Sequence, residues 1–170
     1  MKFRLAYSTD RPAIANIYND VSGKVRGIAR RPEEITETYI FSLLNKPANQ
    51  CIFLVLENED QQIVGFVHAE KMPLAIYNHI LTNYTIVIDP DMQSKGYGEL
   101  IFVEFLNYLT KNRPDVKRLE MESMVVSERI EKFEQLGFKV EATIKERARG
   151  VDGKFYDQAL LAWENPNFKP

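Results

Sequence analysis

Cysteine and histidine are scarce in this chain of 170 residues, which contains one cysteine, Cys51, and two histidines, His68 and His79. A single cysteine excludes an internal disulfide framework and a multi-cysteine zinc site. Two histidines are too few for a histidine-built metal centre, which takes about three or four protein ligands. We therefore expect no bound metal.

A dominant charge is also missing, because 22 Lys and Arg residues stand against 24 Asp and Glu residues, for a net charge of −2. Without a basic field, neither nucleic acid nor an anionic membrane is an expected partner. No stretch approaches the roughly 18 apolar residues of a membrane-spanning helix. Residues 1–7 lack the pattern of a signal peptide, and Arg11 follows before an apolar run can form. These features predict a cytoplasmic protein.

What the sequence does contain is an alternation of strand-like and helix-like segments, with no repeat or linker, so residues 1–170 are expected to form a single domain. Strands are predicted over residues 3–7, 52–56, 62–70, 82–88, 116–124, 138–148 and 155–163, and helices near Pro12 and over residues 32–44, 96–112 and 127–136. The order β-α-α-β-β-β-α-β-α-β-β indicates an α/β fold, a mixed sheet of about seven strands with helices on its faces.

The most informative segment follows the strand over 82–88. Gly96 and Gly98 stand two residues apart where a helix opens, so backbone amides and the helix dipole favour an anion there, and Lys95 adds a positive charge. The pattern predicts a phosphate-bearing ligand. The alternative is that the two glycines only permit a tight turn. The nucleotide triphosphatase and dinucleotide loops, Gly-x-x-x-x-Gly-Lys-Ser/Thr and Gly-x-Gly-x-x-Gly, are both absent.

The segment Gln93-Ser-Lys-Gly-Tyr-Gly98 resembles the Gln/Arg-x-x-Gly-x-Gly/Ala signature of the GNAT superfamily of N-acetyltransferases. Residues 4–18 resemble the family's opening strand and helix, and residues 133–138 resemble its late Tyr-x-x-x-Gly-Phe element. Residues 145–161 resemble small bacterial members that acetylate amino acids, antibiotics or protein N-termini. The resemblance covers essentially the whole chain. It implies a mostly antiparallel seven-stranded sheet flanked by about four helices.

The resemblance also implies acetyl-CoA as cosubstrate. Its pyrophosphate would lie on the backbone of Gln93, Ser94, Lys95, Gly96, Tyr97 and Gly98, and its pantetheine arm would pair with Ile86, Val87 and Ile88. One amide of that strand would polarise the thioester carbonyl, an oxyanion-type site. Ser127 and Phe133 are the further cofactor contacts that the resemblance implies. Relatives are often homodimers, which makes a homodimer an expectation here.

The general base is less clear from the sequence, because residues 81–84 lack the glutamate that often takes the proton in the family. Candidates come from neighbouring strands, where residues two apart share a face: Glu70 with His68, and Glu122 with Glu120. We rank Glu122 and Glu70 first. The alternative is that these charges lie on the solvated face of a sheet.

The general acid is also in question, because Phe133 occupies the position where many relatives have a tyrosine. Either the CoA thiolate leaves unassisted, which a thiol pKa of about 8.5 permits, or Tyr97 or Tyr84 supplies the proton. We prefer the first. The resemblance places the loop that contains Arg26 and Arg30 over the acceptor pocket, where these residues are candidates for binding a substrate carboxylate. The alternative, which we favour, is an ordinary solvated basic loop. Tyr84 and Tyr156 are candidates for lining the same pocket.

The predicted function is transfer of an acetyl group from acetyl-CoA to a primary amine, by direct attack in a ternary complex. The acceptor would be an amino acid, an amine antibiotic, a polyamine or a protein N-terminus. One alternative is an acyl-CoA-binding module with little catalysis. Another is a protein-contact domain in which residues 93–98 are only a turn. Cys51 opens an apolar strand, where a cysteine usually packs as a small hydrophobe rather than acting as a nucleophile.

Overall fold

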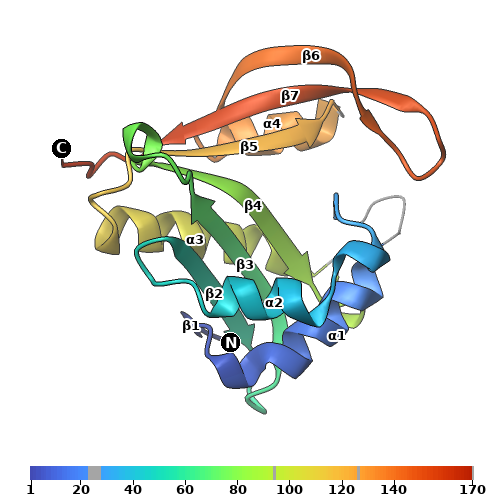
Figure 1. Ribbon diagram of the computed structural model, residues 1–170, viewed down its shortest axis with the longest axis vertical. Coiled ribbons are helices and arrows are strands. Elements are labelled where there is room, and N and C mark those ends of the chain that lie inside the picture. The colour runs from blue at the N-terminus through green and yellow to red at the C-terminus, as the bar shows by residue number, and fades with distance from the viewer. Residues whose placement is uncertain (23–27, 94, 126, 170) are drawn as a thin grey trace. The chain divides into compact units, whose positions relative to one another are not determined.

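The computed structural model describes residues 1–22, 28–93, 95–125 and 127–169 (Figure 1). These residues form two compact units, which we describe separately. Unit 1 contains Met1–Glu70 and Thr85–Asn107, and unit 2 contains Lys71–Tyr84 and Tyr108–Pro170. The boundaries between the units fall within two strands, one of them at its last residue, and within one helix of the chain. The expectation of a single domain over residues 1–170 stays a prediction.

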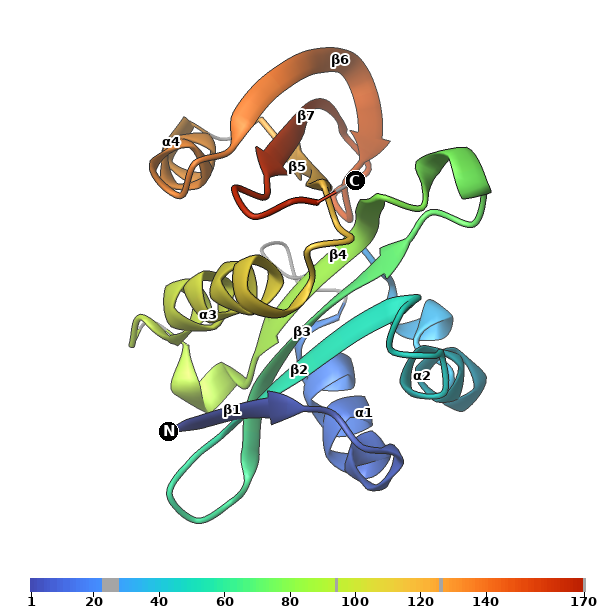
Figure 2. The ribbon, with the colours of Figure 1, turned by 90° about the vertical axis from the view of Figure 1, so that its left-hand side faces the viewer.

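Unit 1 is built on antiparallel strands. These are β1 (Lys2–Leu5), β2 (Cys51–Glu57) and β3 (Ile63–Lys71), with β2 between the other two. Every residue of β2 is buried, as expected for an apolar strand covered on both faces. Helices α1 (Arg11–Val21) and α2 (Glu37–Leu44) lie on one face of these strands, and the start of α3 (Tyr97–Asn112) lies on the other (Figure 2).

The core of unit 1 forms where α1 and α2 meet the sheet. The apolar spacing along α1 places Ile14, Ile17 and Tyr18 on one buried face. They pack in a single cluster with residues of α2 and the strands, among them Ile40, Leu43, Phe53, Val55, Phe66 and Val87. This packing fixes α1 against the sheet and thereby sets the orientation of the Tyr18 side chain.

Two sequence predictions in unit 1 had wrong boundaries. The first strand ends at Leu5 rather than residue 7, because the Asp10 carboxylate accepts the Tyr7 backbone N–H at 2.7 Å and turns the chain. The predicted helix over 32–44 is two elements, a 3-10 turn over Pro32–Glu34 and α2 from Glu37. Thr36 separates them, since its side chain accepts the Tyr39 N–H at 3.1 Å as a helix N-cap.

Unit 2 contains the first part of β4 (Ile80–Ile88) and three later strands, β5 (Arg118–Met124), β6 (Lys139–Arg149) and β7 (Phe155–Glu164). β4 runs parallel to β5, whereas β7 pairs antiparallel with both β5 and β6. Helix α4 (Ser127–Gln135) is followed two residues later by Gly137, whose φ of 91° suits glycine.

The complete strand order is β1-β2-β3-β4-β5-β7-β6, with β4 shared by the two units. The seven-stranded, mostly antiparallel sheet with four α-helices among the described residues is the fold that the sequence predicted. The predicted order of strands and helices is confirmed as well. β6 is an edge strand with two register shifts, and in the second of them Glu146 adopts a φ of 50°.

One buried side chain of unit 2 holds the C-terminal end of α3 by hydrogen bonds. The Asn165 amide nitrogen donates to the carbonyls of Leu109, Arg113 and Val116, at 3.4, 3.0 and 3.0 Å. Carbonyls at a helix C-terminus have no partner within the helix. Asn165 therefore satisfies the last turn of α3 and the segment that follows it.

Candidate functional site

The loop between β4 and α3 lies in unit 1 and is held firmly at its start. The Asp89 backbone N–H donates to the Val64 carbonyl at 3.0 Å, and the Asp89 side chain accepts the Asp91 N–H at 2.9 Å. The Gln93 side chain reaches back to donate to the Ile88 carbonyl at 3.2 Å. These bonds fix the direction in which the chain leaves β4 and enters the residues around Gly96.

The two glycines of the loop have different structural needs. Gly96 has a φ of 81°, a left-handed conformation that favours glycine. Gly98 lies in the first turn of α3 without positive φ, and among the described residues a Cβ there would come near the Ile88 side chain alone, at 4.0 Å. A turn therefore explains Gly96 but not Gly98. A ligand lying against the backbone needs positions where, as here, the described neighbours leave room.

The other residues predicted to contact the cofactor lie around these glycines. The Val87 and Ile88 side chains are buried, while Ile86 is half-buried. Lys95 is exposed, with its Nζ 3.7 Å from the Met92 sulfur, and Tyr97 is half-buried at the start of α3. Ser94 lies outside the described residues.

β4 approaches β3 closely at Gly65. A Cβ at Gly65 would come within 2.6 Å of the Ile88 side chain and 3.0 Å of the Val87 carbonyl. A larger residue would force the Ile88 side chain to shift and would crowd the Val87 carbonyl. The close packing of residues 87 and 88 in unit 1 is thus favoured by a glycine more than twenty residues earlier in the chain, between Val64 and Phe66.

The two leading candidate bases have different surroundings. Glu70 is buried on β3 and forms an ion pair with Lys46, so for Glu70 the solvated-face interpretation is wrong. Glu122 lies in unit 2 on β5, 46% exposed, and pairs with Arg147 at 3.0 Å. Its neighbour Glu120 pairs with Arg118 at 2.9 Å. Glu70 and His68 are both buried and stand two residues apart on β3.

His68 forms a buried pair that the sequence did not reveal. Its Nε2 lies 2.7 Å from the Tyr18 hydroxyl, and its ring is fully buried. Burial, helped by the charges of Arg30 and Lys46, lowers the pKa of His68 to about 3. The imidazole is therefore neutral near pH 7 and poorly suited to accept a proton as a general base.

Aromatic contacts extend this pair toward α2. The Tyr18 ring packs 4.7 Å from Phe66 and edge-on to Tyr39 at 6.1 Å. The Arg30 guanidinium carbon lies 4.1 Å above the Tyr39 ring. Burial raises the pKa of Tyr18, and hydrogen bonding from Thr85 on β4 partly opposes that rise. The Tyr18 hydroxyl therefore stays protonated next to β4.

The remaining candidates are placed as follows. Burial raises the pKa of Tyr84 well above its usual value, so its hydroxyl stays protonated. The Tyr156 hydroxyl, at the start of β7, donates to the Asp152 carboxylate at 2.6 Å. Arg26 lies outside the described residues.

In unit 2, Phe133 lies on α4 with its ring 6.0 Å from that of Phe138. Ser127 begins α4, but its side chain lies outside the described part of the chain. In unit 1, Cys51 is buried at the start of β2, and burial raises the pKa of its thiol to about 11. That environment favours the unreactive thiol form and fits a cysteine that packs as a small apolar residue.

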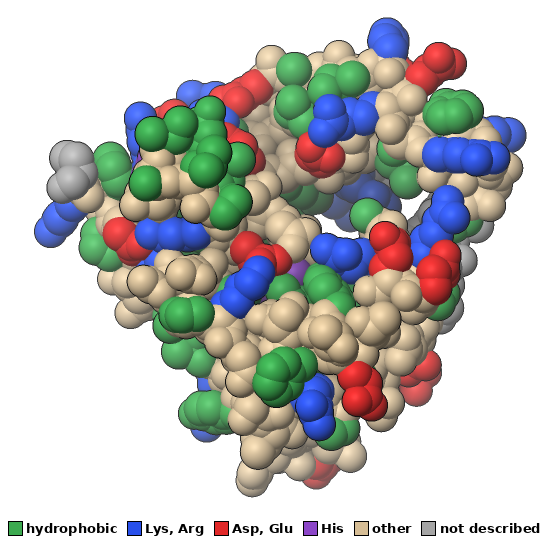
Figure 3. Space-filling view, viewed as in Figure 1, with side chains coloured by type: hydrophobic (Ala, Val, Ile, Leu, Met, Phe, Trp, Pro, Cys, Tyr) green, Lys and Arg blue, Asp and Glu red, His purple; other side chains and the backbone are tan. Residues whose placement is uncertain are grey.

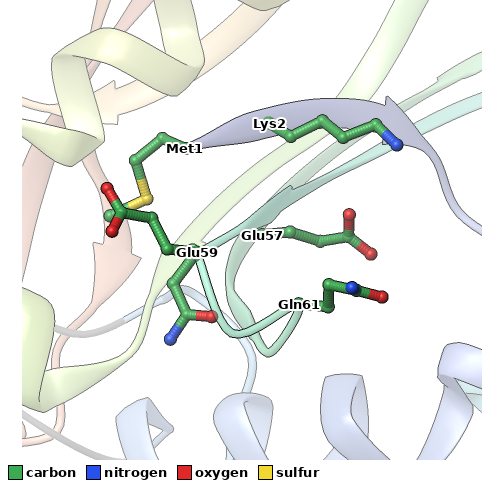
Figure 4. Close-up of a pocket in the computed structure, with 6 residues that line it drawn as sticks. Met1, Lys2, Glu57, Glu59 and Gln61 are labelled. Atoms are coloured by element: carbon green, nitrogen blue, oxygen red, sulfur yellow. The ribbon is translucent and has the colours of Figure 1, made fainter.

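Other surface features do not add a site. Figure 3 shows Lys and Arg side chains interspersed with Asp and Glu on one face. A pocket at the β1 edge is lined by Met1, Lys2, Glu57, Asn58, Glu59 and Gln61 (Figure 4). The Glu57 carboxylate that lines this pocket already forms an ion pair with Arg4, 2.6 Å away. Within the described ranges, no helix is long and apolar enough to cross a membrane, and no cluster of three metal-ligating side chains occurs.

Comparison with known proteins identifies the fold and the family. A sequence profile described as "Acetyltransferase (GNAT) domain" matches residues 4–160. A search of curated protein sequences found no match.

Solved structures share the fold at low sequence identity. The yncA protein of Salmonella typhimurium, solved with its cofactor acetyl-CoA, has a TM-score of 0.82 and 16% identity over 100% of this chain and 96% of its own. The ribosomal-protein-alanine N-acetyltransferase of Brucella melitensis has a TM-score of 0.80 and 21% identity, covering 96% and 99%. A spermidine N-acetyltransferase chimera from Vibrio cholerae has a TM-score of 0.76 and 20% identity, covering 96% and 95%.

Proposed function

Because the chain belongs to the GNAT acetyltransferase family, we propose that it moves the acetyl group of acetyl-CoA to a primary amine in a ternary complex. The observation that carries this proposal is Gly98, a helical glycine that neither its φ nor any neighbour in the described part of the chain requires. A glycine within a helix costs about 1 kcal/mol relative to alanine. Close approach of a ligand to the backbone is a sufficient reason to keep it.

The residues around Gly98 suit the two ends of the cosubstrate. Amides at the N-terminus of α3 would receive the pyrophosphate, with Lys95 adding charge. The backbone of residues 86–88 would pair with the pantetheine arm and direct one N–H at the thioester oxygen. That N–H stabilises the negative charge that grows on the oxygen during attack, an effect worth about 3–4 kcal/mol where one such donor has been removed.

The reaction itself needs few proton transfers. The unprotonated amine attacks the thioester carbon, the new C–N bond forms, and the C–S bond breaks to release CoA thiolate. A thiol with a pKa of about 8.5 leaves without an acid, so Phe133 is compatible with turnover, and Tyr97 remains the candidate acid if one acts. The amine's proton passes to water or to one of the candidate bases, Glu70 and Glu122.

The acceptor is a primary amine of a small molecule or a protein N-terminus. Among the solved structures of this fold, the Brucella protein is titled for a ribosomal protein's alanine and the Vibrio chimera for spermidine. The proposal includes a cytoplasmic location and a homodimer as further expectations.

A thermal-shift titration with acetyl-CoA, alongside CoA and adenosine diphosphate, tests the cosubstrate. Ligand at about 100 times its dissociation constant adds about 2.7 kcal/mol, which raises Tm by roughly 5–10 °C for a chain of this size. Gly98→Ala should keep or slightly raise the unliganded Tm yet lose most of this shift. Asn107→Ala, exposed on the same helix, should retain it.

Two results would contradict the proposal. Absence of any shift with wild-type protein at millimolar acetyl-CoA would make the loop only a turn. A full shift with Gly98→Ala would place the cosubstrate elsewhere. Release of CoA thiol in the presence of an amine panel then separates an enzyme from an acyl-CoA-binding module, which would shift but release none.

A further inference from the structure

Tyr18 brings a polar hydroxyl into the apolar core between α1 and the sheet of unit 1. The Tyr18 side chain is fully buried, and its neighbours Ile14 and Ile17 on the same face of α1 are apolar. The Tyr18 ring packs 4.7 Å from the Phe66 ring, and its hydroxyl lies 2.7 Å from the His68 Nε2. Both contacts are with β3, so the hydroxyl has a defined position beside that strand.

Stability gives little reason to place a hydroxyl and an imidazole at this position. Burying a polar group costs free energy unless a hydrogen bond compensates. Replacing both partners of a buried hydrogen bond by apolar groups of the same shape is often nearly neutral. What the hydrogen bond adds is direction, because it fixes the geometry of the groups that it joins. The Tyr18–His68 pair therefore supplies a defined geometry that apolar side chains of similar size would lack.

The third polar group at this position belongs to Thr85 on β4, which acts on the Tyr18 hydroxyl by hydrogen bonding. Thr85 and Val87 stand two residues apart on the strand and therefore share a face. Val87 belongs to the same core cluster as Tyr18. This part of β4 thus meets α1 through a polar group at Thr85 and an apolar core at Val87, on either side of residue 86.

The segment predicted to bind the thioester, residues 86–88, is held at its far end by contacts that do not involve Tyr18. β4 approaches β3 closely at Gly65. The Gln93 side chain donates to the Ile88 carbonyl at 3.2 Å. These contacts restrain the end of β4, where the chain enters the loop that leads to α3.

The near end of the same segment follows an irregular position in β4. Asn83 has a φ of 50°, a left-handed conformation that interrupts the extended backbone of the strand. Thr85 stands two residues further along, directly before residue 86. The contact between Thr85 and the Tyr18 hydroxyl therefore restrains the chain where β4 resumes its extended path.

We propose that Tyr18 is a positioning residue for acetyl transfer, whose buried hydroxyl holds Thr85 and thereby aims a backbone N–H of residues 86–88 at the thioester oxygen. This role rests on the proposed function, and Tyr18 serves it without touching acetyl-CoA. The direction of the N–H matters most for the negative charge that grows on the oxygen during attack. Loss of the Tyr18 hydroxyl should therefore lower kcat and leave the affinity for acetyl-CoA nearly unchanged.

The direct test observes the thioester carbonyl of bound acetyl-CoA, which needs no acceptor amine. Acetyl-CoA labelled with carbon-13 at that carbonyl should show a downfield NMR displacement on binding to wild-type protein, because a hydrogen bond to the oxygen withdraws electron density from the carbon. Tyr18→Phe should bind acetyl-CoA yet lose most of the displacement. Thr85→Val keeps the β-branched shape without the hydroxyl and should lose it too, whereas Thr85→Ser keeps the hydroxyl and should retain it. No displacement in wild-type protein would refute the N–H contact and with it the role of Tyr18.

Kinetics with the most active amine of the panel give a second measurement, at a temperature where urea curves show each variant fully folded. Tyr18→Phe should lower kcat on the order of tenfold to a hundredfold, the scale for misplaced reacting groups, with KM for acetyl-CoA nearly unchanged. Tyr18→Phe combined with Thr85→Val should be no slower than the slower single variant, because both changes break one contact. Asn165→Ala removes a buried hydrogen-bonding side chain from unit 2. As the destabilised control, it should keep both kcat and the carbonyl displacement.

The outcomes separate this role from the proposed function. If wild-type protein fails to bind acetyl-CoA, the proposed function is wrong. If it binds and Tyr18→Phe keeps the wild-type displacement and kcat, the positioning role is wrong while the proposed function stands. Equal losses in Tyr18→Phe and Asn165→Ala would also overturn the role, because instability alone would then explain them. Should Tyr18→Phe fail to fold, Thr85→Val and Thr85→Ser decide the question, and equal displacements in these two variants would refute the role.

Discussion

Replacing Tyr18 by phenylalanine should destabilise the protein far more than the loss of one oxygen atom suggests. The ring contacts to Phe66 and Tyr39 remain, but His68 loses the hydroxyl that lies 2.7 Å from Nε2. The other ring nitrogen, Nδ1, is buried with no hydrogen-bond partner among the described residues. An unsatisfied buried polar group costs about 1–3 kcal/mol. We expect the free energy of unfolding, measured in urea, to fall by that amount.

A double-mutant cycle isolates the contribution of the contact itself. His68→Leu removes the imidazole that lies 2.7 Å from the Tyr18 hydroxyl, so this variant should also be destabilised. The combined variant, Tyr18→Phe with His68→Leu, removes both polar groups, and such replacements are often nearly neutral. The two single costs should therefore exceed the double cost by about 1–2 kcal/mol. If the costs simply add within about 0.5 kcal/mol, the two side chains do not form an energetically coupled pair.

Two further predictions concern pH and the end of α3. The pKa of His68 is about 3 in the folded state, against 6.5 for the free side chain, so the unfolded chain binds the extra proton between these values. The contribution of the neutral His68 side chain to stability is complete above pH 6.5 and is lost as pH falls, by up to about 1.4 kcal/mol per pH unit. Urea titrations from pH 7 to pH 4 should therefore show a shallower decline of the unfolding free energy for His68→Leu than for wild type. Equal slopes for the two proteins would contradict the pKa assignment. Asn165→Ala should lower the unfolding free energy by about 2–3 kcal/mol, because three carbonyls lose a shared donor, whereas Asn167→Ala, whose side chain makes one exposed bond to Thr110, should cost well under half of that.

The order of strands and helices was predictable because it is encoded locally. Continuous apolar runs such as residues 52–56 and helical spacing in residues 96–112 need no knowledge of the rest of the chain. Boundaries failed where a single side chain captured a backbone N–H. α2 begins later than predicted because the Thr36 hydroxyl accepts the Tyr39 N–H, and β1 ends earlier than predicted because the Asp10 carboxylate accepts the Tyr7 N–H. Such captures depend on geometry that periodicity does not contain.

In the candidate site, too, the features encoded within a few residues were predictable, whereas those that depend on distant contacts were not. Residues 93–98 were located from the spacing of two glycines, a signal that lies within six residues. The Tyr18–His68 pair joins positions 50 residues apart in the sequence, and neither residue stands in a motif. Tyr18 reads as an ordinary core position of an amphipathic helix. A polar hydroxyl on an otherwise apolar helix face is the one signal that would have marked it for attention.

The two register shifts in β6 have a consequence for how the protein meets other copies of itself. A long, flat edge strand offers its unpaired N–H and C=O groups to any passing strand and promotes aggregation. The left-handed Glu146, held by a 3.0 Å bond from its N–H to Asp157, interrupts that row of groups along β6. At the opposite edge, β1 is only four residues long. Copies of this chain therefore have little to gain by joining their sheets edge to edge, and a homodimer would have to bury side chains instead.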